Sequence, residues 1–423
     1  MPNLRLFLVL VFLAHGSVAE SENVDFFELL IANPELKAAE ATAKADRIDV
    51  KVANSQRLPK LSVSGRTGYL DSNLTVPLAN FEQTFNLETS PHSAELVLEQ
   101  ALYTSGAITS SISAAAANAD ASDQLKNAIR QEVILAGATA MANLVRDRGA
   151  LQVRQQNEDI IRQRLAESNS RFDVGLATKT DVLQSESRYA ASTAESAIAQ
   201  SNLYASEQAF YRLFGVNATG QLRLPAIPTP IPGSLDSALS IAQRQAPQLL
   251  SQRNSASAAA HRVKEARGLS LPQVSLSAQA ATAKEQILGQ SVGDSEQYGV
   301  FLNVSVDLFA GGENRARIKA AKQRSIAAQY NLEQVQRRVR QTVADNWNAR
   351  LASIAALQAR RKQVRAAELS RDGVVKEAEA NRRTRLDVLD AELELANAQV
   401  SRLEAQRDAI VAEFALLATL GEL

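Results

Sequence analysis

The stretch FDVGLATKTDVL, residues 172–183, interrupts one long helical pattern and begins another. Gly175 is the residue type that most readily takes the left-handed conformation just past the end of a helix. A second copy, NRRTRLDVL, occupies residues 381–389. There Asn381 stands in place of the glycine, and asparagine also tolerates the left-handed conformation. The sequence therefore predicts two helical hairpin tips.

The helical segments around the tips repeat at a constant spacing of 206 residues, which also relates Gly215 to Gly421. The long segments that precede the tips, residues 107–174 and 313–380, contain no proline, and shorter return helices are predicted over residues 180–214 and 386–420. At 1.5 Å per residue a continuous helix over the first segment is about 100 Å long. Such helices need support from neighbours along their length, so we expect a bundle or tube of helices.

The two copies also begin in the same way. Asn33 and Pro34 open a helical run that Pro59 stops, and Pro247 opens a run that Pro272 stops; proline suits the first turn of a helix. We expect a first repeat over residues 20–215 and a second over 236–423, joined by a proline-rich connector at 216–235. The connector is either a strap along packed halves or a flexible linker between independent domains.

Each copy contains two segments with the alternation of half-buried strands. In the first, Leu61 and Val63 alternate with Ser62 and Ser64, and the same pattern begins at Val274 in the second copy. The later strands run near residues 95–102 and 301–308, and a polar loop is expected within each pair. One interpretation is a small soluble sheet packed on the helices. In lipid, four strands per chain cannot close a barrel and an open edge is not tolerated. Three chains would supply twelve strands, within the known even-numbered range.

Residues 1–19 have the features of a secretory signal: Arg5, an apolar run, and small residues before Glu20. No later stretch approaches the roughly 20 apolar residues of a membrane-spanning helix. The chain has 423 residues, zero formal net charge and no cysteine. Balanced charge gives no reason to expect nucleic acid. The missing cysteine removes disulfides, Cys-ligated metals and a lipid-bearing anchor.

The residues also argue against an enzyme. After the signal only His92 and His261 remain, and neither lies in a pattern typical of a catalytic site. The pair Gly311 and Gly312 lacks the Lys-Ser/Thr that completes a phosphate-binding loop. We expect no catalytic residues, no cofactor and no metal.

Several motifs together resemble the TolC family of outer-membrane efflux and secretion proteins. They are NPEL at residues 33–36, Leu-Pro before each first strand, LFAGG at 308–312 and VGLATKTDVL at 174–183. With the two repeats, the resemblance covers essentially the whole mature chain. It implies a mixed α and β membrane protein: a homotrimer with a long α-helical barrel continuous with a 12-stranded transmembrane β-barrel.

The resemblance also implies the function. The chain would be the outer-membrane exit duct of a tripartite system, with its helical part in the periplasm of a Gram-negative bacterium. It would dock on a periplasmic adaptor and an inner-membrane ABC or proton-driven pump. The cargo, protein or small molecule, stays open, as does whether the gate opens alone or only on docking. A periplasmic coiled-coil adaptor is the alternative, but it does not explain two alternating strand pairs.

At the second tip the resemblance implies a gate. Asp387 and Asp390 share a helix face and align with the acidic constriction of the periplasmic entrance, where three copies would form rings that attract cations. Arg383 aligns with an arginine that ties this hairpin to its neighbour, with Thr180 and Asp181 as its partners. Thr180 is also expected to cap the return helix beside it.

The remaining tip residues have two interpretations. Val174, Gly175 and Leu176 resemble the surface that meets the adaptor, with Asn381 as the counterpart in the second copy, although plain turn chemistry also explains the glycine and the asparagine. The second tip departs from the family pattern because Ala378 stands where an aromatic residue is usual. Arg382 and Arg385 add charge whose role the sequence leaves open.

Overall fold

The computed structural model describes residue 30 and residues 32–423 except 79–80, 221–225, 288–289 and 381. The expected signal segment, residues 1–19, lies outside the described residues. The chain divides into two compact units, which are described separately: one comprises Met1–Asn33, Ala136–Ala226 and Gln363–Arg407, and the other Pro34–Leu135, Ile227–Lys362 and Asp408–Leu423.

The helices of the two repeats correspond in length. Helices α3 (Ala107–Asp173) and α7 (Glu313–Glu379) have 67 residues each, α4 (Lys179–Phe214) and α8 (Arg385–Leu420) have 36 each, and α2 (Pro34–Ser55) and α6 (Pro247–Gly268) have 22 each. The predicted helices are therefore confirmed, with ends that differ by one or two residues. Within the described part of the chain, no helix is long and apolar enough to cross a membrane.

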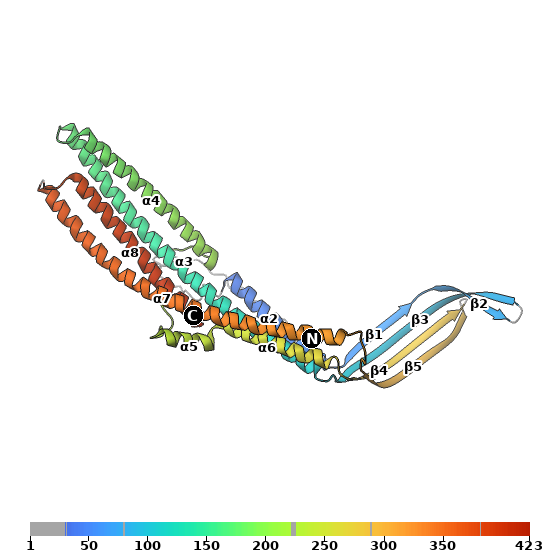
Figure 1. Ribbon diagram of the computed structural model, residues 1–423. Helices are drawn as coiled ribbons and strands as arrows, with labels where there is room; N and C mark the ends of the chain where they lie inside the picture. The colour runs from blue at the N-terminus through green and yellow to red at the C-terminus, as the bar shows by residue number, and fades with distance from the viewer. Residues whose placement is uncertain (1–29, 31, 79–80, 221–225, 288–289, 381) are drawn as a thin grey trace, which may run out of the picture. The chain divides into compact units, whose positions relative to one another are not determined.

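In the first unit, the tip-side parts of α3, α4, α7 and α8 lie alongside one another (Figure 1). Close approach depends on small residues: a Cβ on Gly149 of α3 would lie 2.9 Å from the Leu403 side chain of α8. Polar contacts add to this packing, since Arg154 donates a 2.9 Å hydrogen bond to Asn397. Buried Asp147 accepts hydrogen bonds from Arg146 and, on the neighbouring α4, from Ser206. The two hairpins of this unit are thus fixed to each other by contacts from α3.

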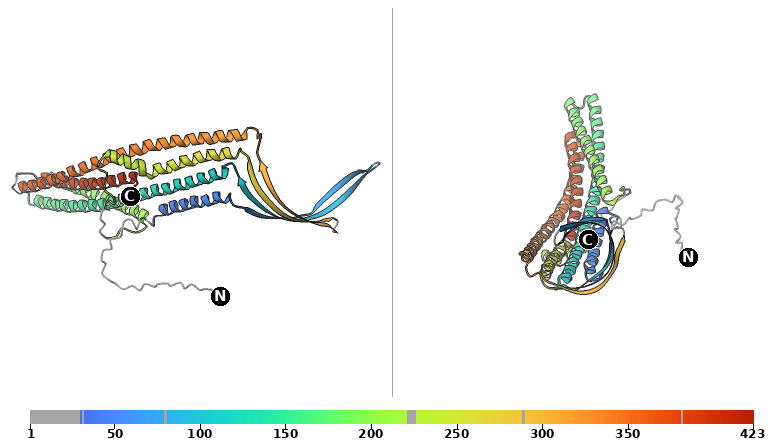
Figure 2. Two further views of the ribbon diagram at one scale, coloured as in Figure 1. Left: turned by 90° about the horizontal axis from the view of Figure 1, so that it is seen from below. Right: turned by 90° about the vertical axis from the view of Figure 1, so that its right-hand side faces the viewer.

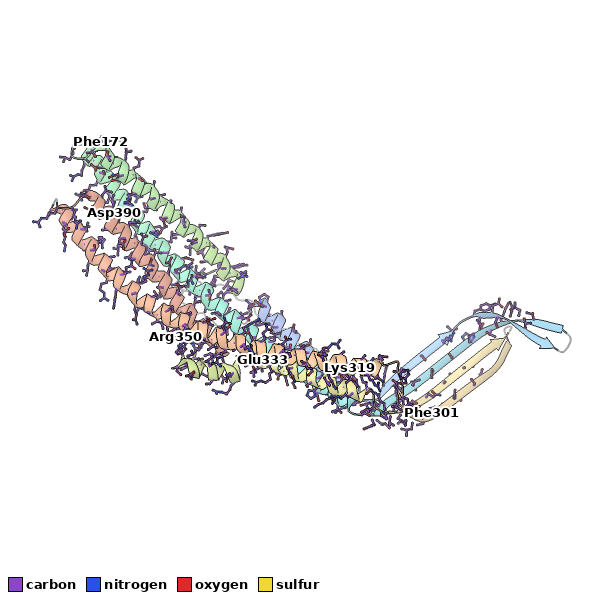
Figure 3. The ribbon with its side chains drawn as sticks, viewed as in Figure 1. Phe172, Phe301, Lys319, Glu333, Arg350 and Asp390 are labelled. Carbon is purple, nitrogen blue, oxygen red and sulfur yellow. The ribbon has the colours of Figure 1, made fainter. Side chains whose placement is uncertain are left out.

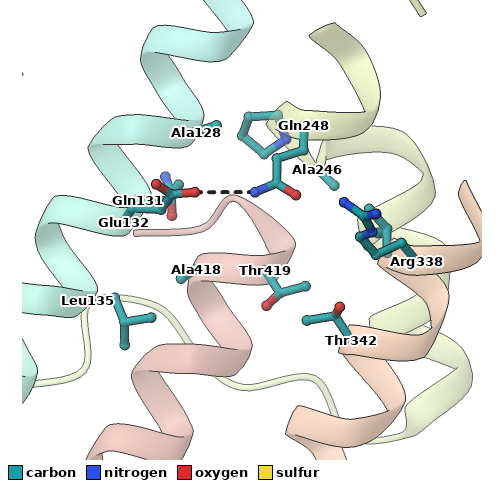
Figure 4. A pocket seen from close by; sticks show the side chains of 12 residues that line it. Ala128, Gln131, Glu132, Leu135, Ala246, Gln248, Arg338, Thr342, Ala418 and Thr419 are labelled. Carbon is teal, nitrogen blue, oxygen red and sulfur yellow. Dashed lines mark hydrogen bonds between the residues drawn. The ribbon is translucent and has the colours of Figure 1, made fainter. Parts of the chain in front are cut away.

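In the second unit, α2, α3, α6 and α7 lie side by side (Figure 2). Its core includes Leu416 and Leu420 of α8 and Val343 of α7, all fully buried. A small cavity of about 130 Å³ lies beside this core, where Gln248 donates a 3.3 Å hydrogen bond to Glu132 (Figure 4). This core cluster is built from residues of the second repeat, and the cavity beside it is lined by residues of both repeats.

One helix was missed by the sequence analysis. Helix α5 (Leu235–Gln245) follows the described part of the connector and precedes Pro247. Ser234 caps it by accepting a hydrogen bond from the N–H of Ser237, and its Ala238 and Ala242 are buried in the core. With only 11 residues, it offered little periodicity to recognise.

The second unit also contains one antiparallel sheet. Its strands are β1 (Lys60–Thr67), β2 (Leu70–Leu78), β3 (Phe81–Tyr103), β4 (Gln273–Ile287) and β5 (Gln290–Ser305). The order is β1-β3-β4-β5, and β2 pairs with the other end of β3. Lys60 pairs with Glu99 and Leu70 with Thr89, so the register continues unchanged from β1 to β2. The prediction of a polar loop in the first copy was therefore wrong. Much of that segment is strand, because β2 and the first half of β3 form a hairpin that extends the sheet. Because β1 and β2 pair with the same side of β3, the five strands occupy four positions across the sheet.

The predicted alternation is confirmed by the pairing. One row across the sheet consists of Val63, Leu96, Ala280 and Tyr298. Val63 is 77% exposed and Tyr298 75% exposed. Directly paired residues share a face, so the apolar side chains form one continuous exposed face. None of the described helices covers that face. This contradicts the interpretation as a soluble sheet packed on helices. An exposed apolar patch of this kind marks a membrane or protein contact.

Candidate functional site: the two hairpin tips

The first tip closes with a tight backbone turn between α3 and α4. Gly175 has φ of 76°, as predicted. Its N–H donates to the carbonyl of Phe172 at 2.9 Å, and the N–H of Leu176 donates to Arg171 at 2.8 Å. The left-handed residue thus lets the last carbonyls of α3 find partners. At the second tip the N–H of Arg382 donates to the carbonyl of Glu377 at 2.8 Å, the bond equivalent to that of Leu176.

The predicted left-handed conformation of Asn381 lies outside the described residues.

Both return helices begin with the same capping pattern. The Thr178 hydroxyl accepts from the N–H of Asp181 at 3.2 Å, while the Asp181 carboxylate accepts from the N–H of Thr178 at 2.8 Å. Thr384 and Asp387 repeat these bonds at 3.2 and 2.9 Å. The prediction that Thr180 is the cap was wrong, because it lies inside α4. The reciprocal bonds require a threonine three residues before the acid, which only Thr178 satisfies.

These caps shift the acidity of two predicted gate or tether residues. Hydrogen bonds from the Thr178 backbone and side chain lower the pKa of Asp181, and those from Thr384, helped by the charge of Arg383, lower the pKa of Asp387. Hydrogen bonds that favour a carboxylate act in this direction. Both acids therefore carry negative charge well below neutral pH.

A pH prediction follows from these shifts. Because the folded pKa values lie below the ordinary aspartate value of about 3.9, the caps stabilise the tips above that pH and lose this contribution as pH falls through the lowered values. We expect faster amide exchange in the first turns of α4 and α8 below about pH 4, after correction for the intrinsic rate. Hydrogen-exchange mass spectrometry measures this. In a variant carrying Thr178→Val and Thr384→Val, the same turns should exchange fast even at pH 6; protection at pH 6 equal to that of the parent would contradict the role of the caps.

Ion pairs made by Arg188 and Arg385 connect the hairpins. A guanidinium nitrogen of Arg188 on α4 lies 2.6 Å from the carboxylate of Asp390 on α8, which is labelled in Figure 3. Arg385 at the start of α8 lies 2.9 Å from the carboxylate of Glu167 on α3. The structure thus gives Arg385 an internal partner. It also shows that one of the two predicted gate acids is already paired within its own chain.

The predicted gate tether is not formed inside the chain. Arg383 lies 3.0 Å from Glu377 of its own hairpin, a contact that raises the pKa of the guanidinium. Asp181 is engaged by Thr178. Thr180 is exposed. The resemblance places the tether between neighbouring hairpins, so it stays a prediction for an assembly.

The first tip presents apolar side chains to solvent. Val174 is 69% exposed and Leu176 67% exposed. Lys179 lies over the ring of Phe172, with 5.8 Å between its nitrogen and the ring centre; Figure 3 labels this phenylalanine at the tip. Exposed apolar residues beside a fixed turn suit contact with a partner.

Sequence reasoning missed Arg188 and Glu167. Both lie in helices whose existence was predicted, but their partners are 202 residues or more away in the sequence. Pairing across hairpins depends on the rotation of each helix about its axis, and the small apolar residues of these helices gave no strict heptad to fix it.

Comparisons with known proteins agree with this geometry. A family model described as "Outer membrane efflux protein" matches residues 27–216 and 238–422. The chain is 25% identical to the outer membrane efflux protein BepC of Brucella suis over 92% of this chain and 83% of BepC. It is 26% identical to the outer membrane protein TolC of Escherichia coli, over 96% and 84%. The crystal structure of the Campylobacter jejuni CmeC outer membrane channel has a TM-score of 0.81 at 16% identity, over 100% of this chain and 94% of CmeC.

Proposed function

Because the chain belongs to the outer membrane efflux protein family, whose place is the outer membrane of Gram-negative bacteria, we propose that three copies form one channel-tunnel. Twelve strand positions would close a barrel through the membrane, and the long helices would form a tunnel in the periplasm. The family is one of transport channels, and this trimer would serve as the exit duct of a tripartite system.

The exposed apolar face of the sheet is the observation that carries the proposal. Val63 and Tyr298 belong to this face. Within the described chain, β1 pairs only with β3 and β5 only with β4, so each leaves one open edge. Lipid does not tolerate open edges. Pairing β5 of one copy with β1 of the next copy would remove both open edges. A periplasmic adaptor, the alternative function, would leave this face without a role.

The tips would then meet the rest of the transport system. Exposed Val174 and Leu176, with Gly175 between them and Asn381 on the second tip, would contact a periplasmic adaptor coupled to an inner-membrane ABC or proton-driven pump. Either type I protein secretion or small-molecule efflux fits this duct, since pump and adaptor determine the cargo. The type of pump encoded beside the gene discriminates between them.

The entrance would be gated by the second tip. Asp387 and Asp390 would form acidic rings in the trimer that attract cations. Arg383 would tie the hairpin to Thr180 or Asp181 of a neighbouring one and hold the mouth closed. If so, Arg383→Ser raises the resting single-channel conductance in planar bilayers. An unchanged resting conductance contradicts the tether.

Gel electrophoresis and membrane fractionation test the assembly directly. We expect a heat-resistant band at three times the mass of the mature chain, which is the 45.6 kDa chain less the expected signal residues 1–19, recovered with the outer-membrane fraction. The purified protein should form cation-selective channels in planar bilayers. A monomer in the soluble periplasmic fraction would contradict the proposed function and favour the adaptor alternative. The unsubstituted full-length protein is the material for all three measurements.

A further inference from the structure

A cavity of about 240 Å³ lies between the two hairpin tips of the first unit. Leu176, Leu386 and Leu389 line it together with three arginines, Arg164 and Arg171 of α3 and Arg385 of α8. A cavity of about 150 Å³ is enough to hold benzene, so this one has room for a larger ring. It combines an apolar wall with a cationic wall.

The cationic wall already holds one carboxylate. Glu167 places one oxygen 2.9 Å from Arg385 and the other 3.2 Å from Arg164. Each guanidinium contributes one nitrogen to one oxygen, so two arginines from different hairpins share a single carboxylate through charge-assisted contacts. The side chains of the pair are partly exposed, 45% for Arg385 and 35% for Glu167, so a carboxylate from solvent can reach the same groups.

The charges on the wall leave one cation in excess. Arg164, Arg171 and Arg385 face two acids, Glu167 and Asp181, and the Asp181 carboxylate is taken by Thr178. Among the residues that the structure describes, Arg171 has no ion-pair partner. A single negative charge on an apolar body matches this lining. A dianion would exceed the free positive charge, and a neutral molecule would leave the arginines unused.

We propose that this cavity binds a small amphipathic monoanion, an aromatic or short aliphatic carboxylate, whose charged group replaces Glu167 between Arg164 and Arg385. The apolar part of the ligand lies against Leu176, Leu386 and Leu389. Such a ligand connects α3 to the start of α8 in the same way as Glu167 does. The site uses residues of one chain, so its binding does not depend on the proposed trimer or on transport.

Isothermal titration of the full-length protein in detergent with 1-naphthoate tests the proposal, and 1-naphthamide, which has the same shape and no charge, is the control ligand. We expect 1-naphthoate to bind at least about tenfold more tightly, since a bond between charged partners contributes well above a neutral one. Arg164→Gln removes one of the two guanidinium groups that hold the carboxylate in the proposal, so it should weaken 1-naphthoate about tenfold and leave 1-naphthamide unchanged. The control variant Arg162→Gln, on the same helix and paired with Asp159, should bind both as the parent does.

Glu167→Gln is the decisive variant. It removes the internal competitor and frees both arginines, so 1-naphthoate should bind about tenfold more tightly than to the parent protein. General damage to the cavity would instead weaken both ligands. Equal affinities for 1-naphthoate and 1-naphthamide, or a Glu167→Gln variant that binds 1-naphthoate more weakly, would overturn the proposal. Far-ultraviolet circular dichroism confirms that each variant keeps its helices.

Discussion

Val300→Arg is expected to abolish the heat-resistant trimer and remove the protein from the outer-membrane fraction. Val300 is 71% exposed and belongs to the apolar row of Leu61, Leu98 and Ala278 across the sheet. If this face meets lipid, an arginine near the middle of the membrane costs about 2–4 kcal/mol per chain, and the proposed trimer carries three. In a sheet that faced water, the same change at an exposed position would be nearly neutral, within about 0.5 kcal/mol.

Gln297→Arg is the matched control for this experiment. Gln297 lies on the same strand but in the row of Ser64, Glu95 and Ala281, which belongs to the opposite face. It adds the same charge and volume three residues away, toward the lumen of the proposed barrel. We expect a normal trimer and normal fractionation. Equal losses in both variants, or in neither, would show that the apolar face does not meet lipid.

The helices were predictable because the residues that begin and end them are local signals in the sequence. Prolines mark the starts and stops of α2 and α6, and glycines 215 and 421, both with positive φ, mark the ends of α4 and α8. Each helix boundary could then be compared with its counterpart in the other repeat. The strand faces followed from alternation alone. Strand β2 was missed because the segment after Tyr69 was interpreted as a polar connection, whereas its pairing partner is the first half of β3.

The details of the tips were only partly predictable. Turn chemistry placed Gly175 correctly, but the prediction chose Thr180 as the cap, whereas the hydrogen bonds show that Thr178 caps the helix. The pairs of Arg188 with Asp390 and of Arg385 with Glu167 depend on packing between hairpins. A sequence without a strict heptad does not specify that rotation. Charged residues at the tips could be identified, but their partners could not.

Arg188→Gln is expected to make the proposed channel about tenfold more sensitive to block by the trivalent cation La³⁺. In the chain the Asp390 carboxylate lies 2.6 Å from Arg188, so its charge is largely offset. Removing the arginine restores one negative charge per chain. In water a unit charge about 8 Å from a trivalent ion interacts with about 1.5 kcal/mol, close to tenfold in binding. The measurement is the half-blocking concentration in planar bilayers at low ionic strength, where screening is weak.

Matched variants separate this effect from a general change in charge. Arg162→Gln removes an arginine from the neighbouring helix, where it pairs with Asp159 within the same helix, and should leave the half-blocking concentration unchanged. Adding Asp390→Asn to Arg188→Gln should cancel the gain in sensitivity, because the freed charge is gone. Asp387→Ala with Asp390→Ala should weaken the block strongly, since both proposed rings are removed. If the sensitivity gained in Arg188→Gln persists when Asp390 is neutralised, then Asp390 is not the acid that Arg188 masks, and the block must act at another part of the entrance.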